Sequence, residues 1–111
     1  PAGDWMEGGL GRSRHLMKHP AATFFVRVSG DSMIDAGIHS GDLLVVDRSL
    51  DAVDGNVIVA ALDGELTVKR LSKRGEILRL LPANSDYQPI EILAQQTFEI
   101  FGVVTNVIHS L

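Results

Sequence analysis

The 111-residue sequence contains no cysteine, which excludes disulfides, cysteine nucleophiles and thiolate metal sites. It has no stretch approaching the ~20 consecutive apolar residues that a membrane-spanning helix needs. It also has no basic segment followed by an apolar stretch at its start, so we expect no export signal. These absences predict a cytoplasmic protein without a membrane segment.

Positive charge is scarce as well. Ten Lys and Arg residues stand against 14 Asp and Glu residues, a formal net charge of -4. An acidic domain is poorly suited to hold phosphate backbones, so we expect no direct, sequence-specific DNA binding. Apolar residues, in contrast, make up 45% of the chain, and a domain of this size buries roughly two-thirds of its unfolded surface. The sequence therefore predicts one small domain that needs no metal or disulfide to hold its core.

The composition changes near residue 20. Residues 1–19 are glycine-rich and show no sustained hydrophobic period, which is typical of a flexible arm. A helical turn over residues 14–18 would have to end before Pro20, because the residue preceding a proline disfavours the α region. We expect an N-terminal arm over residues 1–19 and a β domain over residues 20–111.

Beyond the arm, β-branched and aromatic stretches alternate with Gly, Asn and Asp turn residues, and no strong helical period is present. The expected strands cover residues 23–28, 43–46, 57–62, 65–71, 76–81 and 98–107, with a loop over residues 82–89. The second of these strands is apolar on both faces, as in a strand buried on both sides. This pattern predicts a mainly β fold of curled, barrel-like sheet.

A hairpin is predicted at Asp63 and Gly64, which separate two β stretches. Both central residues of a type I′ turn need positive φ, and Asp-Gly satisfies that requirement. Such a turn would place Leu62 opposite Glu65 and, further along the same register, Ile58 opposite Lys69.

Two weak motifs could carry chemistry. Ser32 lies in a polar turn after a strand, where its hydroxyl can stand clear of the sheet and the turn's amides can converge as an oxyanion hole. Lys69 shares a strand face with Thr67 and Leu71. Burial would lower the pKa of this lysine, and a neutral amine could take the proton of a serine hydroxyl. Taken alone, the serine motif is more typical of an ordinary polar turn, and the lysine motif is more typical of a solvated strand end.

Other candidate sites are weaker. His15 and His19 have i, i+4 spacing but lack a third metal ligand, and His39 and His109 are far apart in sequence. No Gly-x-Ser-x-Gly elbow supports a Ser-His-Asp triad. Aspartates beside glycines or at strand ends are expected to cap or turn the backbone. These are Asp35, Asp42, Asp47, Asp51 and Asp54. We expect no metal and no cofactor.

Read together, the motifs resemble the LexA/UmuD family of self-cleaving Ser-Lys peptidases. The resemblance runs from His19 to Ile108, with the matching stretches in family order. They are residues 24–33, 37–38, 41–47, 64–71 and 81–85. The resemblance implies the coiled, curled β-sheet fold that this family shares with signal peptidases. A signal peptidase itself is disfavoured because the chain shows no membrane anchor.

The resemblance also implies a catalytic dyad. The family's nucleophile matches Ser32, in Gly-Asp-Ser-Met, and its general base matches Lys69, in Thr-Val-Lys-Arg. The backbone N–H groups of Ser32 and Asp31 would stabilise the oxyanion. Supporting positions are Thr67, Gly30 and Met33. Replacing Lys69 by arginine should abolish cleavage, because a guanidinium does not lose its proton.

Within the family, the UmuD branch is the most similar. This implies a bacterial SOS-response protein whose short arm is removed by self-cleavage, stimulated by the RecA filament on single-stranded DNA. The shortened product would form a homodimer and join a UmuC-like polymerase as part of the error-prone translesion DNA polymerase V. Residues 1–5 resemble the region just after that cut, so the chain is expected to be the shortened form. The strand at 98–107 is expected to be an edge that the dimer covers.

Two alternatives remain open from the sequence. The chain could be the self-cleavage domain of a LexA-like or phage-type repressor, which has a helix-turn-helix domain upstream. It could also be a non-catalytic β scaffold that serves as an interaction module, with Ser32 and Lys69 in ordinary structural roles.

Overall fold

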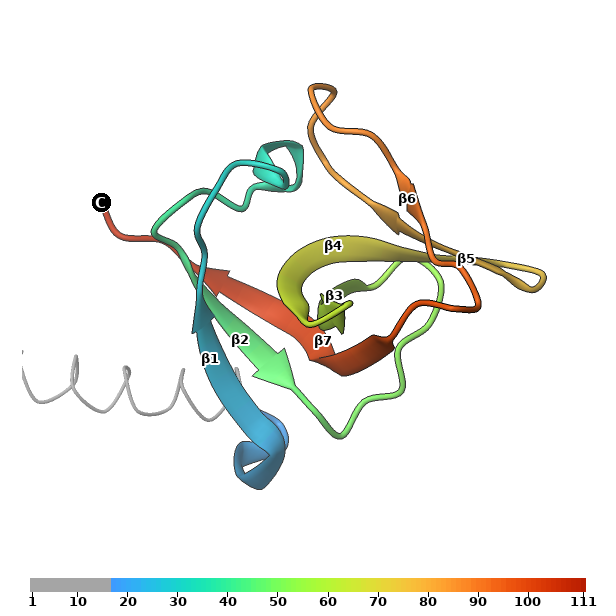
Figure 1. Cartoon of the computed structure of the whole chain (residues 1–111). Helices are drawn as coiled ribbons and strands as arrows, with labels where there is room; N and C mark the ends of the chain where they lie inside the picture. Colours follow the sequence, from blue (N-terminus) through green and yellow to red (C-terminus); the bar gives the residue numbers. More distant parts are fainter. Residues whose placement is uncertain (1–16) are drawn as a thin grey trace, which may run out of the picture.

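The computed structural model describes residues 17–111, and Figure 1 shows their arrangement. Most of the arm expected over residues 1–19, including His15 and the start of the expected helical turn, lies outside the described residues. The elements in chain order are the 3-10 turn η1 (Pro20–Ala22), the strand β1 (Thr23–Arg27), the 3-10 turn η2 (Ile34–Ala36) and the strands β2 (Leu43–Asp47), β3 (Val57–Leu62), β4 (Glu65–Arg74), β5 (Ile77–Leu81), β6 (Ile90–Glu91) and β7 (Phe98–Ile108). Between residues 17 and 111, no helix has the length and apolar character needed to cross a bilayer.

All seven strands belong to one antiparallel sheet in the order β1-β2-β7-β3-β4-β5-β6. The sheet is strongly coiled, and β4 bends round as it leaves its turn with β3 (Figure 1). The predicted mainly β, curled-sheet fold is confirmed. Each of the six expected strands is present within a few residues of its expected bounds. The two-residue strand β6 was not predicted, because two residues carry no detectable period.

The hairpin between β3 and β4 has the predicted register. Leu62 pairs with Glu65, and Ile58 pairs with Lys69. Asp63 has φ 51 and Gly64 has φ 82, so both turn residues take the positive φ that the type I′ turn requires.

The C-terminal strand corrects one expectation. β7 lies in the middle of the sheet, between β2 and β3, and is not an edge to be covered by a second chain. Register shifts on either side let it follow both neighbours, and it passes β2 so closely that a Cβ on Gly102 would lie 2.7 Å from Val46 Cγ1. The alternation of apolar and polar residues along this strand fits an edge position and a central position in the sheet equally well. Its place depends on how the sheet closes.

Two clusters of buried apolar side chains fill the interior. The first contains Met33, Ile38, Leu44, Val46 and Val59. The second contains Ile58, Ala60, Leu71, Leu80 and Val103. Neighbouring residues of one strand, Ile58 and Val59, belong to different clusters, so β3 is buried on both faces. The first cluster underlies the loop after β1, and the second underlies the β4–β5 side.

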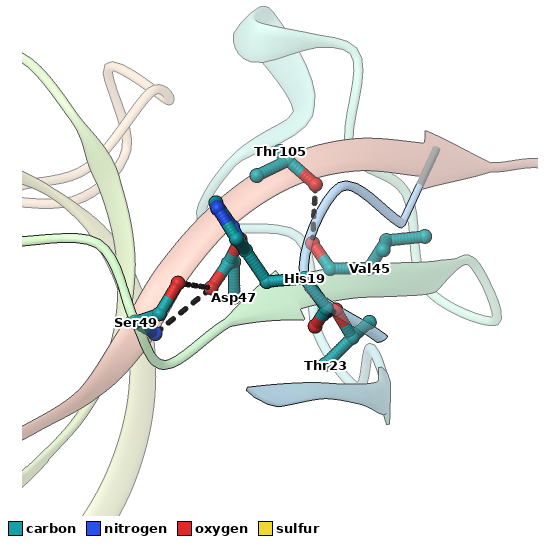
Figure 2. Close-up of polar contacts among 6 residues, drawn as sticks. All are labelled: His19, Thr23, Val45, Asp47, Ser49 and Thr105. Carbon is teal, nitrogen blue, oxygen red and sulfur yellow. Dashed lines mark hydrogen bonds and ion pairs between the residues drawn. The ribbon is translucent and has the colours of Figure 1, made fainter. Parts of the chain in front are cut away.

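Polar contacts tie the start of the described chain to the end of β2 (Figure 2). His19 Nδ1 lies 2.6 Å from Asp47 Oδ2, and Asp47 Oδ1 accepts bonds from the Ser49 amide at 2.8 Å and hydroxyl at 2.6 Å. Thr23 Oγ1 donates to the His19 carbonyl at 2.7 Å. The bonds from Ser49 and the contact with His19 lower the pKa of Asp47 to about 2. Asp47 was expected to cap or turn the backbone, and its bond with the Ser49 amide does so. Through His19, Asp47 also anchors the segment before β1.

Candidate active site

Ser32 lies in the loop between β1 and β2. Backbone bonds between Val28 and the turn at Gly41 and Asp42, each 2.9 Å, extend the strand pairing beyond β1. The chain then turns at Gly30, whose φ of +96° a side chain would strain. Met33, directly after Ser32, is only 3% exposed and packs in the first apolar cluster. The serine therefore stands between a glycine turn and a buried anchor.

A second loop holds this serine from the other side. The Ala83 amide donates to the Ser32 carbonyl at 2.8 Å, and the Asp35 amide donates to the Ala83 carbonyl at 2.7 Å. These two bonds join the segment after β5 to the serine loop as a short ladder. The backbone on either side of Ser32 is thereby restrained by residues about 50 positions later in the chain.

Lys69 reaches the serine from β4. Its Nζ lies 2.9 Å from Ser32 Oγ, 2.8 Å from Thr67 Oγ1 and 3.2 Å from the Val68 carbonyl oxygen. Thr67 is on the same strand face as Lys69, as the strand period requires. The structure thus brings together three side chains that the sequence singled out, with the amine at the centre.

The surroundings of Lys69 favour its neutral form. Burial removes water from the ammonium and lowers the pKa of Lys69 below 10.5, while the negative charge of Glu65 opposes this shift. Thr67 and Val68 supply oxygen acceptors but no charge. The amine therefore keeps hydrogen-bond partners when it loses its proton, which a general base needs.

An open groove of about 350 Å³ passes over the pair. It is lined by residues 26–33 and 65–69, together with Ile38 and Tyr87. Among residues 17–111, β1 pairs only with β2, and residues 65–69 pair only with β3. The groove is therefore bordered by backbone that has no strand partner on one side, and an extended peptide can bind such an edge.

Comparison with known proteins identifies the family. The model of the peptidase S24-like family matches residues 5–105. The chain belongs to this family. The SamA protein of Salmonella typhimurium is 47% identical over 109 residues, which cover 98% of this chain and 75% of that protein. The ImpA protein of Escherichia coli is 46% identical over 112 residues, covering 98% and 74% respectively. The resemblance to the LexA/UmuD family of serine-type self-cleaving peptidases is confirmed.

Two of the predicted supporting residues of this S24-like peptidase are part of the loop framework. Gly30 provides the turn, and Met33 anchors the loop in the core. Asp31 and Ser32 line the groove, and the role of their backbone amides in stabilising an oxyanion stays a prediction. Sequence reasoning missed the contribution of Asn84 and Tyr87, which contact Asp31 from the second loop. The family-like stretch at 81–85 was a signal for Asn84, and Tyr87 lies two residues beyond it.

The peptidase also contains a cluster of His39, Asp42 and His109. The positions of these residues in the sequence did not suggest that the three lie together. His109 Nδ1 lies 2.6 Å from Asp42 Oδ1, and the His39 amide donates to Asp42 Oδ2 at 2.8 Å. These contacts, that with His109 above all, lower the pKa of the Asp42 carboxyl. Since both carboxylate oxygens are hydrogen-bonded, the cluster acts as a tie between the end of β7 and the turn before β2.

Proposed function

We propose that this S24-like peptidase cleaves its own chain with Ser32 as nucleophile and Lys69 as general base. The observation that carries the proposal is the 2.9 Å separation of Lys69 Nζ from Ser32 Oγ, together with the lowered pKa of the amine. A primary amine within hydrogen-bond distance of a serine hydroxyl is a known alternative to histidine for activating that nucleophile.

The partners of Lys69 support this role. A neutral amine has two N–H donors and one lone pair. Thr67 Oγ1 and the Val68 carbonyl oxygen can accept the two N–H bonds, which leaves the lone pair for the Ser32 hydroxyl. Thr67 thereby orients the base, and its hydroxyl takes part in no bond making.

The reaction then follows acyl transfer. Lys69 takes the hydroxyl proton as Ser32 Oγ attacks the scissile carbonyl carbon, and the backbone amides of Ser32 and Asp31 stabilise the resulting oxyanion. The lysine returns the proton to the leaving amine, and the peptide bond breaks. Water, deprotonated by the same lysine, attacks the acyl-enzyme and releases Ser32.

The substrate of this step is an extended peptide segment. The groove is open and bordered by the unpaired edges of β1 and β4, so a strand-like segment can hydrogen-bond along it while its carbonyl faces Ser32. Within the family this segment is the arm upstream of the β domain, and it could come from the same chain or from a second chain.

We also propose the cellular role of the UmuD branch for this chain. Cleavage of the arm is stimulated by the RecA filament on single-stranded DNA, and the product is a homodimer that joins a UmuC-like polymerase in error-prone translesion synthesis. The net charge of -4 supports protein partners over direct contact with DNA. Analytical ultracentrifugation and copurification with the polymerase test these two associations.

The nucleophile can be tested with a fluorophosphonate probe, which reacts with activated serines. We expect the protein to be labelled at Ser32 and Ser32→Ala to be unlabelled, while Ser110→Ala at the exposed C-terminal end is labelled at the parent rate. In a chain carrying the upstream arm, RecA filaments should promote cleavage that Ser32→Ala stops. Labelling or cleavage that persists in Ser32→Ala would refute the assignment.

A further inference from the structure

Asn84 is one of the few polar side chains that are buried, with 8% exposure. It lies in the loop between β5 and β6, and both ends of its amide are used. Asn84 Nδ2 donates to the Asp31 carbonyl oxygen at 3.0 Å, and Asn84 Oδ1 accepts from the Asp86 amide at 2.9 Å. Burial of an amide is costly unless it is hydrogen-bonded, and here its donor is directed at the residue before the nucleophile.

The bonded carbonyl belongs to the peptide unit that contains the Ser32 N–H. A trans peptide is planar, so its C=O and N–H point in opposite directions, and none of the described peptide bonds is cis. A donor that holds the Asp31 carbonyl therefore sets the direction of the Ser32 N–H. The Ile34 amide also donates to this carbonyl, but at 3.3 Å, which makes Asn84 the closer restraint.

The same loop also contacts the two residues that flank this peptide plane, Asp31 and Ser32. The Ala83 amide holds the Ser32 carbonyl at 2.8 Å. The Tyr87 hydroxyl donates to the Asp31 carboxylate. Residues 83–87 thus contact Asp31 and Ser32 at three points, of which the Asn84 bond is the one that acts on the proposed oxyanion donor.

We propose that Asn84 is a positioning residue that orients the Ser32 N–H toward the oxyanion through the peptide plane it shares with the Asp31 carbonyl. The inference rests on the proposed function of Ser32. Removing the Asn84 donor lets the peptide plane rotate, which weakens the stabilisation of negative charge in the transition state and leaves the groove and the dyad in place.

Asn84→Asp tests this bond with almost no change in shape. The introduced carboxylate still accepts from the Asp86 amide, but it has no hydrogen to donate and repels the Asp31 carbonyl. In fluorophosphonate labelling, Ser32 Oγ attacks phosphorus, the P–F bond breaks, fluoride leaves and Lys69 receives the hydroxyl proton. The phosphoryl oxygen develops its charge where the peptide oxyanion would lie. We expect the maximal labelling rate to fall roughly tenfold to a hundredfold, with little change in the probe concentration for half-maximal rate.

Asn56→Asp is the matched control. Asn56 also accepts a backbone amide, that of Val53 at 2.9 Å, in a turn between β2 and β3, and we expect it to label at the parent rate. The ratio of the Asn84→Asp rate to the parent rate should rise as the pH falls, because protonation of the introduced carboxyl restores a donor. Asn84→Ala, followed by thermal unfolding, provides a second variant if Asn84→Asp does not fold.

The outcomes separate the two proposals. If the parent is not labelled at Ser32, the proposed function fails. If the parent is labelled and folded Asn84→Asp or Asn84→Ala reacts at the same maximal rate, the role of Asn84 is refuted while the dyad stands. The inference is also contradicted if Asn84→Asp raises only the probe concentration for half-maximal rate and leaves the maximal rate unchanged. It is likewise contradicted if the ratio of the Asn84→Asp labelling rate to the parent rate does not change with pH, since a purely structural role for the loop would give these results.

Discussion

The two members of the proposed dyad are held in different ways. Lys69 lies on β4, and its register is set by the two-residue turn at Asp63 and Gly64 only a few positions before it. Ser32 lies in a loop, and the shortest bonds to its own peptide units come from Ala83 and Asn84, about 50 positions later. The proposed base is therefore placed by local structure, and the proposed nucleophile is placed mainly by tertiary contacts.

The two regions meet in the first apolar cluster. Met33 follows Ser32 and belongs to this cluster, and Val68, which precedes Lys69, packs against it. Val68 also pairs with Val59 across the β3–β4 ladder. A common packed core thus sets the separation of serine and lysine, because close-packed interiors allow little relative movement of the residues anchored in them.

The largest effect is expected at the base. Lys69→Arg keeps the positive charge and the strand, but a guanidinium does not deprotonate at any working pH. We expect the fluorophosphonate labelling rate to fall by about a thousandfold. Lys73→Arg, at an exposed position of the same strand, should react as the parent does. A residual rate within tenfold of the parent would show that Lys69 is not the base.

The tertiary placement of the nucleophile can be broken at its anchor. Met33→Ala removes a side chain that is 3% exposed in the first cluster, and we expect the free energy of unfolding to fall by about 2–5 kcal/mol. Labelling of the protein that remains folded should also slow. Val53→Ala, at a side chain that is 56% exposed, should change the stability little. Denaturant unfolding followed by labelling below the transition separates the two effects.

The pH dependence of labelling sharpens the description of the lysine. Because burial lowers the pKa of Lys69 below 10.5, the neutral amine is present at lower pH than for a free lysine. The rate should rise about tenfold per pH unit below the pKa of Lys69 and level off above it. A rate profile with its midpoint at or above 10.5 would contradict a buried base.

A pair of glycines compares the two regions directly and carries the smallest expected effect. Gly30 and Gly64 both have positive φ, +96° and +82°, and neither has an atom within 4 Å of an added Cβ. Replacing either by alanine should therefore cost about 1 kcal/mol of unfolding free energy through backbone strain alone. Gly64→Ala should label at the parent rate when folded, whereas Gly30→Ala, two residues before the nucleophile, should label more slowly. Equal labelling rates in the two variants would show that the turn at Gly30 does not help to position Ser32.

The hairpin and the buried strands could be predicted because their determinants are local. Asp-Gly between two β stretches specifies the turn, the turn specifies the register, and the register places Lys69 opposite Ile58. The doubly apolar β2 is buried over all but its first residue, as expected. Ser32 was recognised from its turn and from the family-like motif.

Features that depend on long-range pairing were missed or wrongly predicted. β7 was expected at an edge, but it closes the sheet between β2 and β3. The side-chain contact of Asp42 with His109, and that of Asn84 with Asp31, join residues whose separation in sequence has no characteristic spacing, whereas the bond between Asp42 and the His39 amide is the local backbone role expected of this aspartate. Nothing in residue type alone distinguishes Asn84 from an ordinary loop asparagine.

By itself, the sequence determined the β class, the hairpin that carries the lysine, the acidic charge and the motifs of the family. Those properties depend on composition, on the two-residue period and on turn residues, all of which act over a few positions. Only the tertiary structure decided that Lys69 Nζ lies 2.9 Å from Ser32 Oγ and that Asn84 Nδ2 donates to the Asp31 carbonyl oxygen. Such distances follow from the closure of the sheet around a common core, which brings segments 37 and 53 residues apart into contact.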